Sequence, residues 1–90
     1  MDEMNEHLIK ISEELDSHLG MNFVAEEFFE EINGSDFNRF IIDFNNVEFM
    51  SRSFTQEYLF QKLKTNKEIV EVNVPDDVQK MFDVVSKDFK

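Results

Sequence analysis

The sequence predicts a small α/β fold: a sheet of three to four mainly parallel strands packed against three helices, in the order β-α-β-α-β-α. The first observation behind this prediction is an apolar run that begins at Phe40, stops at the acid Asp43 and is soon followed by a helical segment. Such a run is typical of a strand covered on both faces, as in a parallel sheet. The second observation is that strand-like and helix-like segments alternate along the chain with short connections, which favours right-handed crossovers.

The first strand is expected at residues 7–12, a short segment rich in apolar residues. A polar stretch follows at residues 13–21 and contains Gly20, so a loop is expected there. Residues 13–19 are also compatible with a helical turn, and the sequence leaves the two alternatives open.

The first helix is expected at residues 22–32, because apolar residues recur there at helical spacing and fall on one face. Asn33 and Gly34 come directly afterwards and supply the left-handed residue that ends many helices. The apolar face of this predicted helix consists of Val24, Ala25, Phe28, Phe29 and Ile32.

Residues 39–44 are expected to form the second strand and the centre of the sheet. The second helix is expected at residues 54–63, and Lys62 and Lys64 suit the negative end of its dipole. The side chains expected to point inward from this helix are Phe54, Tyr58, Leu59 and Leu63.

Residues 69–74 alternate between apolar and polar, with three valines on one face against Glu71 and Asn73 on the other. This alternation predicts a strand half open to water, and therefore a strand at the edge of the sheet. Pro75 at a first helical position, with two acids behind it, begins the last helix. Its inward stripe is expected to consist of Val78, Met81, Phe82, Val85 and Phe89.

Length and composition indicate a single domain over residues 1–90, with a modest core filled mostly by its eleven phenylalanines. The chain contains no cysteine, which excludes disulfides, thiolate metal sites and a cysteine nucleophile. No apolar segment approaches the roughly 18–20 residues of a membrane span, and the acidic N-terminus is unlike a signal peptide. We therefore expect a cytoplasmic protein with no membrane partner.

The formal charge of −11 is concentrated in residues 1–36, which hold eleven acids against the single base Lys10. Nucleic acid and anionic membranes are poor partners for such a chain, because neither meets a basic patch. A basic protein surface is the natural complement. The acids of the first predicted helix are interpreted either as a solvated face or as an acidic docking face for a basic partner: Glu26, Glu27, Glu30 and Glu31.

Signals for other chemistry are weak. His7 and His18 are eleven residues apart without an obvious third ligand, so no metal site is expected. The segment that starts at Asp43 begins like a calcium loop but lacks the glycine and the final acid of one. Gly20 and Gly34 are the two glycines, and they form no phosphate-binding loop. We therefore expect no cofactor and no enzymatic activity.

Two polar residues flank the loop between the central strand and the second helix. Ser53, with Gln56 three residues later, fits a capping box and is expected to cap the helix. A hydroxyl at an exposed helix N-terminus is also a place that favours a phosphate, so Ser53 is a phosphoacceptor candidate. Asp43 is expected to accept backbone hydrogen bonds from the turn that follows it, rather than to act in catalysis.

Two short motifs flank the loop after the central strand: Ile41, Ile42, Asp43 and Phe44, then Ser53, Phe54 and Glu57. With these motifs and its order of elements, the chain resembles the STAS domain, the fold shared by sulfate-transporter tails and anti-sigma-factor antagonists. The closer resemblance is to a STAS-like group of bacterial and archaeal proteins with the motif apolar-apolar-Asp-Phe followed by Ser-Phe-x-x-Glu. The resemblance extends loosely over about residues 8–85 and places Ser53 where the antagonists carry a phosphorylated serine. Ser51 and Phe54 depart from the Asp-Ser-Ser-Gly pattern of those antagonists. The resemblance implies a non-enzymatic interaction domain, often found beside histidine-kinase-type ATPase domains.

We therefore expect a regulatory domain that binds another protein, with a kinase-type ATPase or similar regulator as the partner. Arg52 is the base of the loop at residues 45–52, and we expect it to be exposed and able to pair with a partner acid. An alternative from another class is an acidic decoy that blocks a basic, nucleic-acid-binding site on its partner. The predicted interaction surface comprises Asn45, Asn46, Arg52, Ser53, Phe54 and Glu57.

Overall fold

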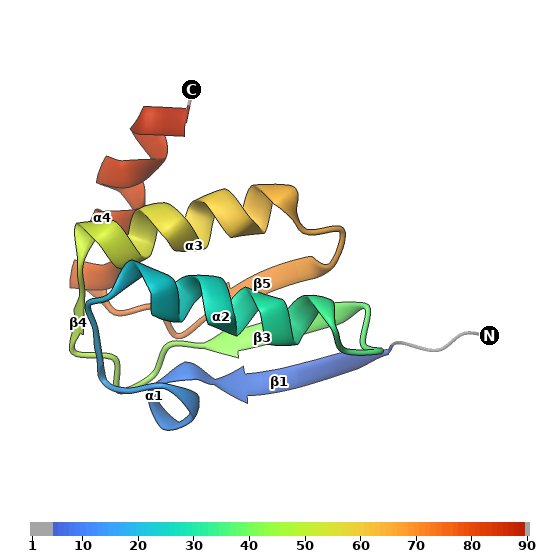
Figure 1. Cartoon of the computed structure of the whole chain (residues 1–90). Helices are drawn as coiled ribbons and strands as arrows, with labels where there is room; N and C mark the ends of the chain where they lie inside the picture. The colour runs from blue at the N-terminus through green and yellow to red at the C-terminus, as the bar shows by residue number, and fades with distance from the viewer. Residues whose placement is uncertain (1–4, 90) are drawn as a thin grey trace.

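A three-stranded parallel sheet forms the base of the computed structural model, which describes residues 5–89 (Figure 1). Its strands are β1 (Glu6–Lys10), β3 (Arg39–Asp43) and β5 (Glu68–Val72), in the order β1-β3-β5. The prediction that residues 39–44 contain the central strand is confirmed, and so is the α/β class.

Two long helices, α2 (Asn22–Asn33) and α3 (Arg52–Lys64), lie side by side on the same side of this sheet (Figure 1). Each helix connects two neighbouring parallel strands, and both connections advance across the sheet in the same direction. Crossovers of one hand that advance in one direction place their helices on one face. The topology therefore leaves the opposite face without either helix.

Burial along β3 follows this division of the sheet into two faces. Phe40 and Ile42 are 2% and 0% exposed under the helices, whereas Ile41 on the opposite face is only half-buried. The prediction that this strand is covered on both faces is therefore wrong. The reason is topological, because the chain supplies one layer of helices where a parallel sheet usually has two.

The position predicted for residues 69–74, at an edge of the sheet, is confirmed, but the predicted assignment of faces is wrong. Ile69 is buried, and the carboxylate of Glu71 points to the helix side, where side chains of α3 bind it. Val70 and Val72 therefore lie on the opposite face of the sheet, where both are half-buried.

Two short elements precede α2. A single helical turn, α1 (Ile11–Glu14), follows β1, so the stretch expected as a loop does contain a turn, although it begins earlier than residue 13. Next comes β2 (His18–Leu19), which pairs in parallel with β4 (Phe49–Met50) of the loop between β3 and α3. This second small sheet ties together two loops at the carboxyl ends of β1 and β3.

The last helix, α4 (Asp76–Ser86), packs beside α3 and continues into a 3-10 turn, η1 (Lys87–Phe89). Pro75 is the N-cap residue rather than the first helical one. Phe89, predicted to point inward, is 39% exposed, because η1 departs from the helical repeat of α4. The buried residues of α4 are Val78, Phe82 and Val85.

Two details of the long helices differ from the predictions. Gly34 ends α2 at a φ of −82°, so the predicted left-handed end is wrong. Its backbone N–H donates to the Glu30 carbonyl at 3.0 Å and closes the helix without a left-handed residue. Leu63, predicted to point inward from α3, is 71% exposed, because it lies on the outer side of the helix layer.

The core centres on Tyr58 of α3, whose side chain is fully buried. Its hydroxyl donates to Glu71 Oε2 at 2.7 Å, and Lys62 Nζ donates to Glu71 Oε1 at 2.9 Å. Burial first, and then the neighbouring carboxylate, raise the pKa of Tyr58 well above its ordinary value. Four rings surround it with centroids 5.2–6.3 Å away, those of Phe29, Phe44, Phe54 and Phe82.

Candidate functional site

The loop between β3 and α3 places Ser51, and not Ser53, at the N-cap of α3. Ser51 Oγ accepts a hydrogen bond from the Phe54 N–H at 3.0 Å and donates one to the Gly20 carbonyl at 2.8 Å. The predicted cap at Ser53 is therefore wrong. Pairing between the small strands fixes the position of the cap, because the Ser51 N–H also donates to the Leu19 carbonyl at 2.8 Å.

Replacing Ser51 with alanine is expected to lower the free energy of unfolding by about 1–2 kcal/mol, because the helix loses its side-chain cap. Ser53→Ala is the matched control and should stay within about 0.5 kcal/mol of the wild type, since this side chain is exposed. Urea unfolding measures both losses. A larger loss for Ser53→Ala than for Ser51→Ala would contradict the assignment of the cap.

Ser53 lies in the first turn of α3, and its exposed side chain lines an open hollow on the outer side of the helix layer. The hollow brings together residues from α2, α3 and η1, which are far apart in the sequence. Its other lining residues are Asn22, Gln56, Glu57, Phe60 and Phe89.

The loop residues predicted to contact a partner are exposed. Asn45 and Asn46 form a turn in which Asn46 has a positive φ of 70°. Arg52 is exposed too, but it pairs within the chain: Arg52 Nη2 lies 3.1 Å from Asp88 Oδ2 of η1. This ion pair ties the C-terminal turn to the beginning of α3.

The last two residues of the predicted interaction surface differ in burial. Phe54 is 0% exposed and packs on Tyr58, so it belongs to the core and offers no surface to a partner. Glu57 is half-buried and accepts a hydrogen bond from Gln61 Nε2 at 2.7 Å. The predicted residues therefore divide between an exposed loop, the hollow beside Ser53 and the core.

Asp43, at the end of β3, accepts the backbone hydrogen bond expected of it. Its Oδ1 accepts from the Asn45 N–H at 2.9 Å and from Asn73 Nδ2 at 3.1 Å. The hydrogen bond from the Asn45 backbone, followed by that from Asn73, lowers the pKa of Asp43 below its ordinary value. This geometry fixes the turn after the central strand.

Because the folded pKa of Asp43 is lowered, its ionised form stabilises the fold above the unfolded pKa, and this contribution disappears as the pH falls through the folded pKa. We expect the wild type to be more stable than Asp43→Asn at neutral pH, and the difference to shrink below about pH 4. Urea unfolding of both proteins across this range measures it. A difference that does not change with pH would contradict the assigned role.

The four glutamates predicted to form an acidic docking face are all exposed on α2. None of them takes part in the ion pairs found within residues 5–89. The pairs Glu26/Glu30 and Glu27/Glu31 place like charges one turn apart, which destabilises a helix by roughly 0.2–0.5 kcal/mol per pair. The helix thus presents an acidic face that the surrounding side chains leave without a matching cation.

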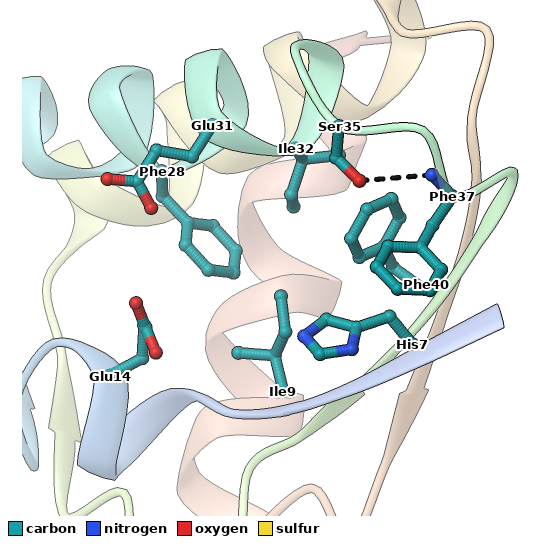
Figure 2. Close-up of a pocket in the computed structure, with 9 residues that line it drawn as sticks. All are labelled: His7, Ile9, Glu14, Phe28, Glu31, Ile32, Ser35, Phe37 and Phe40. Carbon is teal, nitrogen blue, oxygen red and sulfur yellow. Dashed lines mark hydrogen bonds between the residues drawn. The ribbon is translucent and has the colours of Figure 1, made fainter.

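Sequence reasoning missed a cavity of about 180 Å³ between β1 and α2 (Figure 2). The ring of His7 stacks on Phe37 at one end, with centroids 4.7 Å apart, and the carboxylates of Glu14 and Glu31 lie at the other (Figure 2). The walls between them are apolar. The cavity therefore suits a short aliphatic group with a positive charge, and its lining residues come from segments too scattered to leave a motif.

The two histidines occupy separate places. His7 lies in the cavity just described, and His18 Nε2 lies 3.7 Å from Glu48 Oε1 beside the small sheet. Between residues 5 and 89, no three side chains of the metal-binding types gather closely enough to hold a metal ion. The helices of that same part are all too short or too polar to cross a bilayer.

Comparisons with protein-family models, with curated proteins and with solved structures found no match for this chain. The STAS-like resemblance therefore stays a prediction, and the function has to be argued from the surfaces of the molecule.

Proposed function

We propose that this chain is a non-enzymatic, regulatory interaction domain that binds a basic, amphipathic segment of a partner protein. The observation that carries the proposal is a group of large apolar side chains on the outer side of the helix layer. Phe60 and Leu63 of α3 are 45% and 71% exposed, and Phe89 of η1 is 39% exposed. We call these three residues the α3–η1 surface. Contiguous exposed apolar side chains are typical of sites that bind other proteins.

Two neighbouring hollows support treating these side chains as one surface. Phe89 lines both hollows, together with Phe60 in one and with Leu63 in the other. The exposed ion pair between Arg52 and Asp88 also joins η1, which carries Phe89, to the beginning of α3.

The charges near the α3–η1 surface indicate the chemistry of the partner. Glu57 lines the same hollow as Phe60, and so does Asn22 at the start of α2. Glu26 lies one turn after Asn22 on the same side of that helix, and the rest of the acidic face continues from it. Lys62 lines the second hollow and Lys64 lies beside Phe60, so the acids gather at the Glu57 end of the surface. A segment with apolar residues and with lysines or arginines at that end fits this combination.

Ser53 is the residue through which binding would be regulated. It is exposed, and it lines the same hollow as Phe60. A phosphate on Ser53 would add about −2 charge beside the positive end of the α3 dipole. It would strengthen binding to an arginine cluster and weaken binding to an acidic surface. A histidine-kinase-type ATPase is the partner class that the STAS-like resemblance implies.

Affinity capture from a native lysate tests the proposal with three baits: wild type, Phe60→Asp and Phe49→Asp. Phe49 is the matched control because it is 49% exposed and lies on β4, outside the two hollows. We expect at least one protein to be held by the wild type and by Phe49→Asp and lost by Phe60→Asp. Identical captured proteins on all three baits would contradict the proposed surface.

The unneutralised acidic face of α2 favours a second candidate function, an acidic decoy for a basic, nucleic-acid-binding site. Under this alternative, Phe60→Asp would capture the same proteins as the wild type. Replacing Glu27 and Glu31 together by lysine would abolish the capture. Capture would also fall steeply as salt rises, because exposed charges are screened within about 10 Å at 0.1 M ionic strength. Binding through the α3–η1 surface should change much less with salt.

A further inference from the structure

We propose that the uncovered face of the sheet binds a second copy of this chain and forms a dimer with two-fold symmetry. This face, which we call the open face, is opposite α2 and α3 and is made by alternate residues of β1, β3 and β5. The register of the strands arranges them in three rows across the sheet. The rows are Glu6, Arg39 and Glu68; then Leu8, Ile41 and Val70; then Lys10, Asp43 and Val72.

The middle row is an apolar stripe that reaches solvent. Leu8 is 51% exposed, while Ile41 and Val70 are half-buried. On the helix side of the same strands, Ile42 is 0% exposed and Ile69 is 9% exposed. Parallel sheets are almost always covered on both faces, so an uncovered central strand with an apolar row indicates a missing layer.

The two outer rows carry the charges of the open face. In the first row, Arg39 Nη1 lies 3.3 Å from Glu6 Oε1, and Arg39 Nε lies 3.6 Å from Glu68 Oε2. In the third row, Lys10 and Asp43 occupy paired register positions on neighbouring strands. The face therefore carries a net charge of −1 in a chain of −11, so two copies can meet there with little repulsion.

The order of these rows makes the open face complementary to itself. Consider a two-fold axis that runs along the middle row, across the strands. It makes the strands of one copy antiparallel to those of the other, and it places the first row of each copy over the third row of the other. Glu6 then faces Lys10 of the second copy, and Arg39 faces its Asp43. The apolar residues of the middle row, Ile41 among them, face their own equivalents. Each contact between different residues, such as Glu6 with Lys10, occurs twice, and each contact between equivalent residues lies on the axis, as a symmetric dimer interface requires.

The other two-fold arrangement in the plane of the interface, with its axis parallel to the strands, opposes like charges. It would place Arg39 over Arg39 and Asp43 over Asp43, and it would set Glu6 against Glu68 of the second copy. Sheets pack about 10 Å apart with their strands rotated by about 30°, so long charged side chains can still reach across. The charges therefore select the antiparallel arrangement.

The size of the open face sets the expected strength of the dimer. Three strands of five residues cover about 16 Å by 14 Å. Such a footprint, about 220 Å² per copy, is smaller than the interfaces of stable complexes, so we expect a weak dimer that forms reversibly only at high concentration.

Sedimentation equilibrium of the full chain, from micromolar to millimolar concentration, tests the dimer. We expect the average mass of the wild type to rise from 10.8 kDa toward twice that value. Leu8→Asp should remain at the mass of one chain throughout. Leu63→Asp, with the same change at an exposed leucine of the helix layer, should dimerise like the wild type. A wild type that stays monomeric at every concentration overturns the proposal, and so does a Leu8→Asp protein that dimerises normally.

Charge reversal tests the arrangement itself. Lys10→Glu alone sets two carboxylates against each other at both symmetric contacts, and Glu6→Lys alone sets two ammonium groups against each other. Each variant by itself should therefore lose the dimer. An equimolar mixture restores opposite charges at both contacts, so it should recover the mass of a dimer. A mixture that stays monomeric while the wild type dimerises overturns the antiparallel arrangement, and circular dichroism verifies that each variant is folded. The open face and the α3–η1 surface lie on opposite sides, so either proposal can fail alone.

Discussion

Replacing Tyr58 with alanine is expected to lower the free energy of unfolding by about 3–5 kcal/mol, the range for removing a large aromatic side chain from a packed core. The ring is fully buried and contacts four other rings, which belong to α2, α3, α4 and the end of β3. Its removal leaves a cavity where these elements meet. Urea unfolding measures the loss, and a loss below about 1 kcal/mol would show that Tyr58 is not at the centre of the core.

Tyr58→Phe separates the hydroxyl from the ring. The substitution keeps the ring packing but removes the hydrogen bond that the hydroxyl donates to the Glu71 carboxylate. The hydrogen bond from Lys62 to that carboxylate remains. We expect a loss of about 1.5–3 kcal/mol, as for a hydrogen bond to a charged group. A loss as large as that of Tyr58→Ala would mean that the polar network, rather than the aromatic packing, holds the helices on the sheet.

Phe60→Asp is expected to weaken binding of the captured partner by about 30-fold or more, which corresponds to the roughly 2 kcal/mol of an interface hot spot. The Phe60 ring is exposed beside the hollow that it lines with Phe89, and Lys64 Nζ lies 4.8 Å from its centroid. A bound partner would cover this position, so Phe60→Asp would place a buried carboxylate where the wild type has an apolar anchor. Isothermal titration of the purified partner measures the change. Phe49→Asp is the control, and equal affinities for the two variants would contradict the proposed surface.

Much of the fold follows from local patterns in the sequence. The apolar run around Ile42 predicts the central strand, and the helical spacing of Phe28, Phe29 and Ile32 predicts α2. The alternation of strands and helices with short connections predicts parallel strands, whereas the sequence left the order of the strands in the sheet open. These features depend on residues close together in the chain, so the sequence contains the information that decides them.

The faces of the sheet could not be predicted in the same way. Ile41 and Ile42 are adjacent and equally apolar, so the sequence does not distinguish the buried one from the half-buried one. The direction of the two crossovers makes the difference, and it is a property of the whole sheet. The helix-side position of Glu71 was not predictable for a related reason, because its partner Tyr58 lies on another element.

The candidate site was predicted only in part. Ser51 and Ser53 both precede a helical segment, and the glutamine three residues after Ser53 favoured the wrong one. The pairing of β2 with β4, two residues each, selects Ser51, and strands that short leave no pattern. The position of Phe89 beside Phe60 could not be predicted either, because it depends on how η1 turns back toward α3.

Hydrogen–deuterium exchange of this chain, alone and bound to the captured partner, is the most direct test of the proposed function. We predict slower exchange in the backbone amides of residues 52–64 and 87–89 on binding, with little change in β1, β3 and β5. Slower exchange restricted to the sheet strands, or to α2 without α3, would contradict binding through the α3–η1 surface.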